Sequence, residues 1–274
     1  ICMLMATFIV SLMTLFSEED FLSWGWRIPF LLSSVLVLLG LWIRKDIDET
    51  PDFQRVKASG QVAKAPLRDT LKNHWREVLI AAGLKVVETA PFYIFSTFVV
   101  SYATSTLTYQ KSQALEAVTL GALVATIMIP LMGLLSDKVG RQRMYAISVF
   151  VLGLFIVPWF MLLNTGTTWG IVLATVIAFG VLWAPVTAVL GTLCSEIFSA
   201  NVRYTGITLG YQLGAALAGG TAPLIATGLL AKYDGDWVPV AWYLAVTVTI
   251  SLIAIFCASR VKRATLIQAQ PERL

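Results

Sequence analysis

Residues 133–143 read GLLSDKVGRQR, a turn in which four of eleven residues are charged. Long apolar runs lie on both sides of this turn. Gly133 and Gly140 permit a sharp change of direction, and Asp137 can accept hydrogen bonds from exposed backbone N–H groups at a neighbouring helix start. The stretch therefore predicts a short polar connection between two apolar helices.

The composition places most of the chain in lipid. Of its 274 residues, 57% are hydrophobic and 13% are charged, and the mean hydropathy is +0.77. A soluble chain carries about 25% charged residues, whereas a membrane-spanning helix needs about 20 largely apolar residues. Runs that meet or nearly meet this length cover 1–16, 28–44, 78–103, 115–135, 144–163, 170–194, 205–231 and 238–259. These runs predict an all-α polytopic membrane protein with about eight transmembrane helices.

The lysine and arginine positions predict the orientation of these helices. Sixteen cations follow the even-numbered spans, three lie on the opposite side and one lies inside a span. Such a bias marks the cytoplasmic side, so we expect 133–143 and the tail at 260–274 to face the cytoplasm. The long connection at 45–77 lies on the same side, and it is broken by Pro51 and Pro66. Its length suits a tether between two helical bundles.

The reactive side chains do not indicate an enzyme. Cys2, Cys194 and Cys257 lie scattered in apolar runs, and the single histidine, His74, lies in the long connection. This pattern gives neither a disulfide framework nor a metal spacing. A membrane-embedded enzyme would need a nucleophile–base pair or a metal cluster near the interface. We therefore expect no catalytic residue, metal, cofactor or nucleic-acid partner.

The third span carries two charges inside an apolar run. Lys85 and Glu88 are three residues apart, so they share a helix face and can pair. An unpaired charge in the bilayer centre costs about 2.5–3.5 kcal/mol, and buried charges therefore face the protein interior. Two interpretations stay open for this pair: it lines a central cavity, or it is a structural pair between helices. Lys85 alone can also extend towards the membrane surface.

Other polar residues in apolar runs are candidates for a substrate path. Tyr93 and Thr97 follow Pro91 in the third span, and Trp183 and Pro185 lie in the sixth. The seventh span carries small residues at four-residue spacing, which favours close packing of helices. That ridge consists of Gly206, Gly210, Gly214 and Ala218. The candidates for the substrate and proton path are Lys85, Glu88, Tyr93, Thr97, Tyr211 and Gln212.

The turn quoted at the start has a specific spacing, Gly-x-x-x-Asp-x-x-Gly-Arg-x-Arg. It resembles the signature loop of the major facilitator superfamily. The matching residues are Gly133, Asp137, Gly140, Arg141 and Arg143. The resemblance implies a gating latch that holds two bundles together when the transporter faces outward. The alternative is that the two arginines only anchor the helix at the lipid headgroups.

Four further stretches are similar to the metabolite:proton symporter branch of that family, which includes shikimate, 2-oxoglutarate, citrate and proline/betaine carriers. They are WGWRIPFLLS (24–33), DETPDF (48–53), SEIFSANVRYTG (195–206) and GYQLGAALAGGTAPLIATGLL (210–230). The resemblance implies that the chain corresponds to helices 5–12 of a transporter built from two six-helix halves. The four preceding helices are then expected elsewhere in the same protein.

This layout assigns each part of the chain. The chain is expected to divide into the end of the amino-terminal bundle (1–44), a cytoplasmic inter-bundle loop (45–77), a complete six-helix bundle (78–259) and a cytoplasmic tail (260–274).

The resemblance also implies partners for the latch. Glu196 is expected to meet Arg141, with Arg203 close by, and Glu49 resembles the matching residue of the other half. A carboxylate shared between guanidinium groups forms strong bonds when dry and weak ones when water enters. The alternative is an ordinary solvated ion pair that contributes about 0–1 kcal/mol.

The expected function is secondary active transport by alternating access in a bacterial-type inner membrane. The substrate is expected to be a small organic acid or zwitterion, with a proton as the coupling ion and the lipid bilayer as surroundings. Lys85 stands where the branch often has arginine, which weakens the argument for an organic acid because lysine lacks bidentate carboxylate binding. The alternatives are a uniporter or a drug/metabolite exporter of the same superfamily, and a truncated fragment that does not transport.

Overall fold

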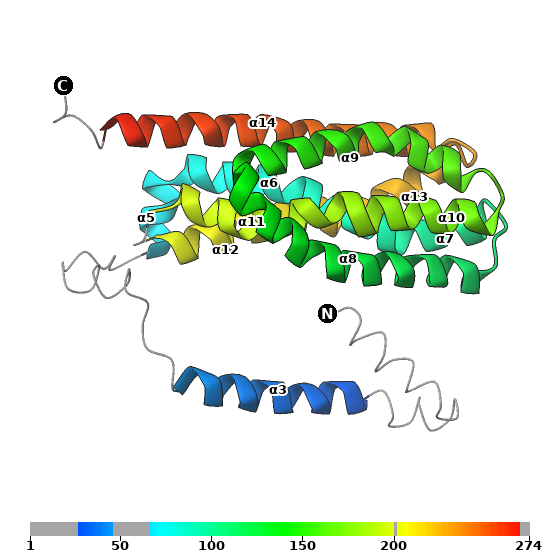
Figure 1. Ribbon diagram of the computed structural model, residues 1–274, viewed down its shortest axis with the longest axis horizontal. Helices are drawn as coiled ribbons and strands as arrows, with labels where there is room; N and C mark the ends of the chain where they lie inside the picture. Colours follow the sequence, from blue (N-terminus) through cyan, green and yellow to red (C-terminus); the bar gives the residue numbers. More distant parts are fainter. Residues whose placement is uncertain (1–26, 46–65, 200–201, 269–274) are drawn as a thin grey trace. The chain divides into compact units, whose positions relative to one another are not determined.

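The computed structural model describes residues 27–45, 66–199 and 202–268 (Figure 1). The chain divides into two compact units, Ile1–Gln61 and Val62–Leu274. Every regular element within the described ranges is a helix. The all-α class expected from the apolar runs is confirmed.

The first unit contains one described helix, α3 (Ile28–Lys45). Its 18 residues correspond to a length of about 27 Å at 1.5 Å per residue. The span expected at 28–44 is therefore helical. The span expected at 1–16 lies outside the described residues.

The second unit is a bundle of long apolar helices. Its elements are α5 (Pro66–Asn73), α6 (Trp75–Tyr93), η2 (Ile94–Phe98), α7 (Val99–Ser105), α8 (Lys111–Val139), α9 (Arg141–Leu163), α10 (Thr168–Thr175), η3 (Val176–Leu182), α11 (Trp183–Ile197), α12 (Arg203–Gly214), η4 (Ala215–Gly219), α13 (Ala222–Lys232) and α14 (Val238–Gln268). In the described residues, six stretches built from these elements are long and apolar enough to cross a membrane. They coincide with the last six runs that the hydropathy predicts.

Part of the expected polar loop at 45–77 is helical, which corrects that prediction. Helix α5 covers Pro66–Asn73 and packs against α6 and α12. Proline is favoured in the first turn of a helix, where its missing N–H leaves no bond unmade. Thr70 is fully buried, so the short helix has an inward face despite its polar sequence. The hydropathy pattern does not predict α5, because a helix of two turns buries too few apolar residues to produce a clear apolar run.

Three of the six spans contain a π-helical segment. Segment η2 follows the proline of α6, η3 separates α10 from α11, and η4 separates α12 from α13. Helix α6 ends at Tyr93, two residues after Pro91. A π-helical turn inserts an extra residue and shifts the side chains beyond it around the helix axis. Hydropathy does not distinguish such a turn from continuous helix.

Helix α6 lies at the centre of the bundle and contacts α11, α12 and α14. The glycine ridge of α12 lets that helix approach α6 closely. A Cβ atom on Gly210 would lie 2.5 Å from Ala81 Cβ, and one on Gly214 would lie 2.5 Å from the Ala82 carbonyl oxygen. The sequence expectation that this ridge packs against a neighbouring helix is confirmed.

Replacing Gly214 by alanine is expected to destabilise the bundle by about 1–3 kcal/mol, the usual effect of overpacking. The added methyl group would meet backbone, which cannot move aside as a flexible side chain does. Gly228→Ala is the matched control, because a Cβ there meets nothing within 4 Å. The melting temperature of each purified variant measures the effect. Equal melting temperatures would show that α12 and α6 do not pack this closely.

Candidate functional site

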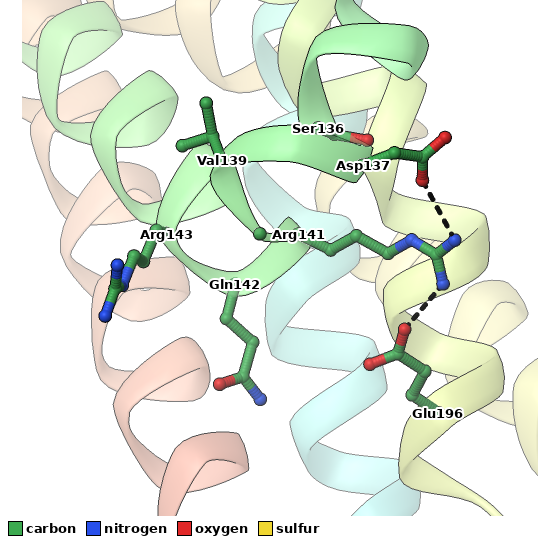
Figure 2. A pocket seen from close by; sticks show the side chains of 8 residues that line it. Ser136, Asp137, Val139, Arg141, Gln142, Arg143 and Glu196 are labelled. Atoms are coloured by element: carbon green, nitrogen blue, oxygen red, sulfur yellow. Dashed lines mark hydrogen bonds and ion pairs between the residues drawn. The ribbon is translucent and has the colours of Figure 1, made fainter.

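The turn between α8 and α9 brings an arginine between two carboxylates (Figure 2). Arg141, the first residue of α9, donates through Nη1 to Glu196 Oε1 at 2.6 Å and through Nη2 to Asp137 Oδ1 at 3.1 Å. Gly140 makes the turn with φ of 95°, a conformation that favours glycine. The ion pairs therefore join the end of α8, the start of α9 and the end of α11.

Water has access to this ion-pair cluster. An open pocket of about 430 Å³ surrounds it, and the Arg141 side chain is 35% exposed. An ion pair in such a place is neither dry nor rigidly buried, so its net contribution to stability is small. The same exposure allows the contacts to break and form again without a large desolvation penalty.

The other residues of the expected latch have different positions and contacts. Gly133 lies inside α8, so its expected part in the turn is wrong and the change of direction occurs at Gly140 alone. Arg143 is exposed and points away from the carboxylates (Figure 2). Arg203 donates to the Phe198 carbonyl at 3.4 Å. Glu49 lies outside the described residues. The contact between Arg141 and Glu196 is present, and its role as a latch stays a prediction.

A second cluster lies within the span formed by α6, η2 and α7. The Lys85 ammonium pairs with Glu88 Oε2, and the side chains are only 17% and 13% exposed. Thr89 Oγ1 lies 3.0 Å from the same carboxylate oxygen. The pairing that the three-residue spacing predicts is therefore present, and Lys85 is held by Glu88 instead of extending to the membrane surface.

Two aromatic residues from other helices complete this cluster. The Lys85 ammonium lies 4.8 Å from the centre of the Tyr211 ring, which comes from α12. Such a cation–π contact stabilises a charge that has few water neighbours. Trp183, the first residue of α11, donates through Nε1 to the Glu88 carbonyl oxygen at 2.7 Å. Its ring also lies 5.3 Å from that of Phe92. Three helices therefore meet at the Lys85–Glu88 pair.

Three further candidates for the substrate path come from α6, η2 and α12. Tyr93, Thr97 and Gln212 are all exposed from the bundle. The Tyr93 ring lies 5.4 Å from that of Phe92, which in turn contacts Trp183. Tyr93 and Thr97 are followed at the same four-residue spacing by the exposed Ser101. In a membrane-spanning helix such a polar face is turned towards water or protein and away from lipid.

Sequence reasoning missed several residues that contact the pair or its backbone. Thr89 bonds the carboxylate, whereas Tyr145 and Ser251 donate to backbone carbonyls of α6. Serine, threonine and tyrosine are common in apolar helices, so their presence alone gives no signal. Among the described residues, no group of three His, Cys, Asp or Glu side chains lies close enough to hold a metal ion.

Comparison with known proteins identifies the family. The chain matches the Major Facilitator Superfamily over residues 2–219 and again over 92–273. The shikimate transporter of Escherichia coli K12 is 32% identical over 265 residues, which cover 96% of this chain and 60% of that protein. A proline/betaine transporter of Salmonella typhimurium is 30% identical over 254 residues, which cover 89% of this chain and 50% of that protein. No solved structure matches the chain.

These matches confirm the resemblance that the sequence motifs indicated. The relatives are named as transporters, so the expectation that the chain is not an enzyme is also confirmed. The chain spans 50–60% of the length of these relatives. Its apolar helices make it a multi-pass membrane protein. The chain belongs to the major facilitator superfamily of membrane transporters.

Proposed function

We propose that the protein is a proton-coupled symporter that carries a small organic acid or zwitterion across the bacterial inner membrane by alternating access. The observation that carries this proposal is the Lys85–Glu88 pair inside a membrane span, with both side chains largely buried. A charged pair in such a place is a functional site by default, because keeping charges in a bilayer is costly.

The pair has the chemistry to bind a carboxylate and a proton together. An ammonium group has three donors, and the pair with Glu88 uses one of them. A carboxylate from the substrate can bind another. Two carboxylates beside one ammonium repel each other, and a proton that enters the site with the substrate removes this repulsion. Substrate binding and proton uptake are then coupled through a single cation.

The polar face at Tyr93, Thr97 and Ser101 supports a path that leads to this pair. It is exposed from the bundle within the same span, so it suits a water-filled cavity between two halves of a transporter. The contacts of Arg141 with Asp137 and Glu196 supply a breakable link at the end of the spans. The lysine and arginine bias supports an orientation in which that link and the carboxyl end of the chain face the cytoplasm.

The relatives suggest which substrates to test first. Those proteins are named for shikimate and for proline and betaine, which all contain a carboxylate group. A carboxylate is the group that Lys85 is suited to bind. The chemistry of the pair therefore fits both an anionic and a zwitterionic substrate.

Uptake by the intact transporter in proteoliposomes tests this function. With an inward proton gradient, we expect radiolabelled shikimate, proline or betaine to accumulate above the outside concentration. A protonophore is expected to abolish the accumulation and leave only equilibration. Equilibration that a protonophore does not change would indicate a uniporter instead. Absence of uptake for the panel, extended to 2-oxoglutarate and citrate, would contradict the symporter assignment.

A further inference from the structure

A short segment of α6, residues 83–88, receives hydrogen bonds from three other helices. Ser251 Oγ of α14 donates to the Gly83 carbonyl at 2.6 Å, and the Tyr145 hydroxyl of α9 donates to the Leu84 carbonyl at 2.5 Å. At the end of the same segment, the Glu88 carbonyl accepts the bond from the Trp183 indole described above. The segment of α6 that carries Lys85 and Glu88 therefore also accepts side-chain hydrogen bonds from three neighbouring helices.

Ser251 occupies a special position in this arrangement. Its hydroxyl donates to the Gly83 carbonyl and also accepts a hydrogen bond from the Val87 amide at 3.1 Å. These two backbone groups are the partners of one α-helical hydrogen bond, because they are four residues apart. The serine thus bridges both ends of a single bond in the helix ladder. A side chain that inserts into this ladder is a known cause of local bending in helices.

The close approach of α14 makes this bridge possible. A Cβ atom on Gly83 would lie 2.9 Å from Ala254 Cβ, so glycine at this position lets the two helices touch. Ser251 and Tyr145 are both fully buried. Helices α9 and α14, which supply the two hydroxyl groups, lie side by side (Figure 1). Two neighbouring helices therefore hold successive carbonyls of α6.

A buried serine does not need a partner on another helix. Hydroxyl groups on α14 normally bond to a carbonyl one turn earlier in their own helix, as Thr247 does with Leu244 and Thr249 does with Ala245. On α9, Ser148 does the same with Met144. Ser251 had this local bond within reach and bonds to α6 instead. The bond to another helix distinguishes Ser251 from a buried hydroxyl group that bonds only within its own helix.

We infer that Ser251 and Tyr145 are positioning residues, which fix the height and tilt of the α6 turn that carries Lys85 and Glu88. They act through the backbone and do not touch the substrate. The inference rests on the proposed function, because it gives the two residues a role in placing the pair for substrate binding. A shift of the pair by about 1 Å is enough to change transport strongly, since misplaced groups of that order lower activity by up to about 100-fold.

The first test measures the backbone directly and does not depend on transport. Hydrogen–deuterium exchange of the intact transporter in nanodiscs is followed in a peptide that covers residues 83–88. For Ser251→Ala and Tyr145→Phe, we expect exchange in this peptide to rise about 2-fold to 10-fold, the factor that one lost hydrogen bond corresponds to. Ser251→Thr keeps the hydroxyl group and is expected to restore slow exchange.

Two control variants remove similar hydroxyl groups elsewhere in the bundle. Ser148→Ala removes a buried hydroxyl that bonds within α9. Tyr109→Phe removes a phenol that donates to the Leu163 carbonyl at 3.0 Å, a bond of the same kind far from the charged turn in sequence. We expect both controls to leave exchange at residues 83–88 unchanged. Exchange in Ser251→Ala and Tyr145→Phe that is no faster than in these controls would overturn the inference.

The second test separates positioning from general stability through uptake kinetics. Proteoliposome uptake of shikimate, proline and betaine is measured for the same variants. Misplacement of Lys85 is expected to raise KM about tenfold in Ser251→Ala, with Vmax changed much less, and Ser251→Thr is expected to recover most of the loss. A parallel loss of Vmax in Ser251→Ala and Ser148→Ala with unchanged KM would contradict positioning. If the parent protein accumulates none of the probes, the proposed function fails, whereas the exchange experiment still decides the backbone role of Ser251 and Tyr145.

Discussion

Glu88→Gln is expected to abolish proton-driven accumulation of substrate while leaving the protein in the membrane. Glutamine keeps the shape of the side chain and removes the carboxylate to which we assign proton binding. For one charge and a potential of 100 mV, the driving force of about 2.3 kcal/mol corresponds to roughly 50-fold accumulation. We expect the variant to lose this factor and to reach equilibration only. The measurement is uptake into proteoliposomes with an imposed inward proton gradient.

Two further variants make the Glu88 result decisive. Removing Glu88 alone leaves Lys85 without its carboxylate, and breaking a buried pair can destabilise a protein by about 3–5 kcal/mol. The double variant Lys85→Gln/Glu88→Gln removes both charges and is expected to be folded but unable to accumulate substrate. Glu116→Gln changes an exposed carboxylate of α8 and is expected to behave like the parent. Unchanged accumulation in Glu88→Gln would return the pair to a purely structural role.

Arg141→Ala is expected to lower the maximal rate of uptake about tenfold, with little change in KM. The arginine bonds to both Asp137 and Glu196, so its loss removes both contacts between the ends of α8, α9 and α11. The latch assignment gives these contacts no part in substrate binding, and an effect on Vmax alone marks a step of conformational change. Asp137→Asn leaves the bond to Glu196 in place and is expected to have the smaller effect.

A control in the same turn separates the latch from simple loss of positive charge. Lys138 is exposed next to Asp137, and Lys138→Ala removes one cation without touching the Arg141 contacts. We expect this variant to transport like the parent, and we expect Western blots of membrane fractions to show equal insertion of all three variants. Normal uptake kinetics in both Arg141→Ala and Asp137→Asn would refute the latch assignment. The headgroup-anchor interpretation predicts instead that insertion falls in Arg141→Ala.

Some features of the site follow from local rules and could be predicted from the chain. Residues three apart on a helix share a face, so the pairing of Lys85 with Glu88 needs only the helix itself. The glycine that makes the α8–α9 turn, Gly140, could also be predicted, because few other residues adopt a positive φ. The i, i+4 ridge of α12 likewise predicted close packing. Each of these inferences depends on geometry within one or two turns of helix.

Other features depend on which helices meet, and no local rule supplies this. Trp183 reaches the Glu88 carbonyl across 95 residues of sequence, and Ser251 reaches Gly83 across 168. In a soluble helix the polar face would show which side is inward. In a membrane the lipid-facing and protein-facing sides are both apolar, so this signal is largely lost. The prediction that a glycine makes the turn was correct for Gly140 and wrong for Gly133. The reason is related, because hydropathy does not mark where a helix ends.

The sequence by itself determined that this chain spans a membrane, since a low charge content and apolar runs of about 20 residues leave no other solvent for it. It also determined the pairing of Lys85 with Glu88, because the period of a helix fixes which neighbours share a face. Only the tertiary structure decided that Tyr211 lies beside Lys85, and that Trp183 and Ser251 bond to the backbone of the same part of α6. The physical reason is that contacts between helices arise from the packing of apolar surfaces, and those surfaces look alike on every face of a helix that lies in lipid.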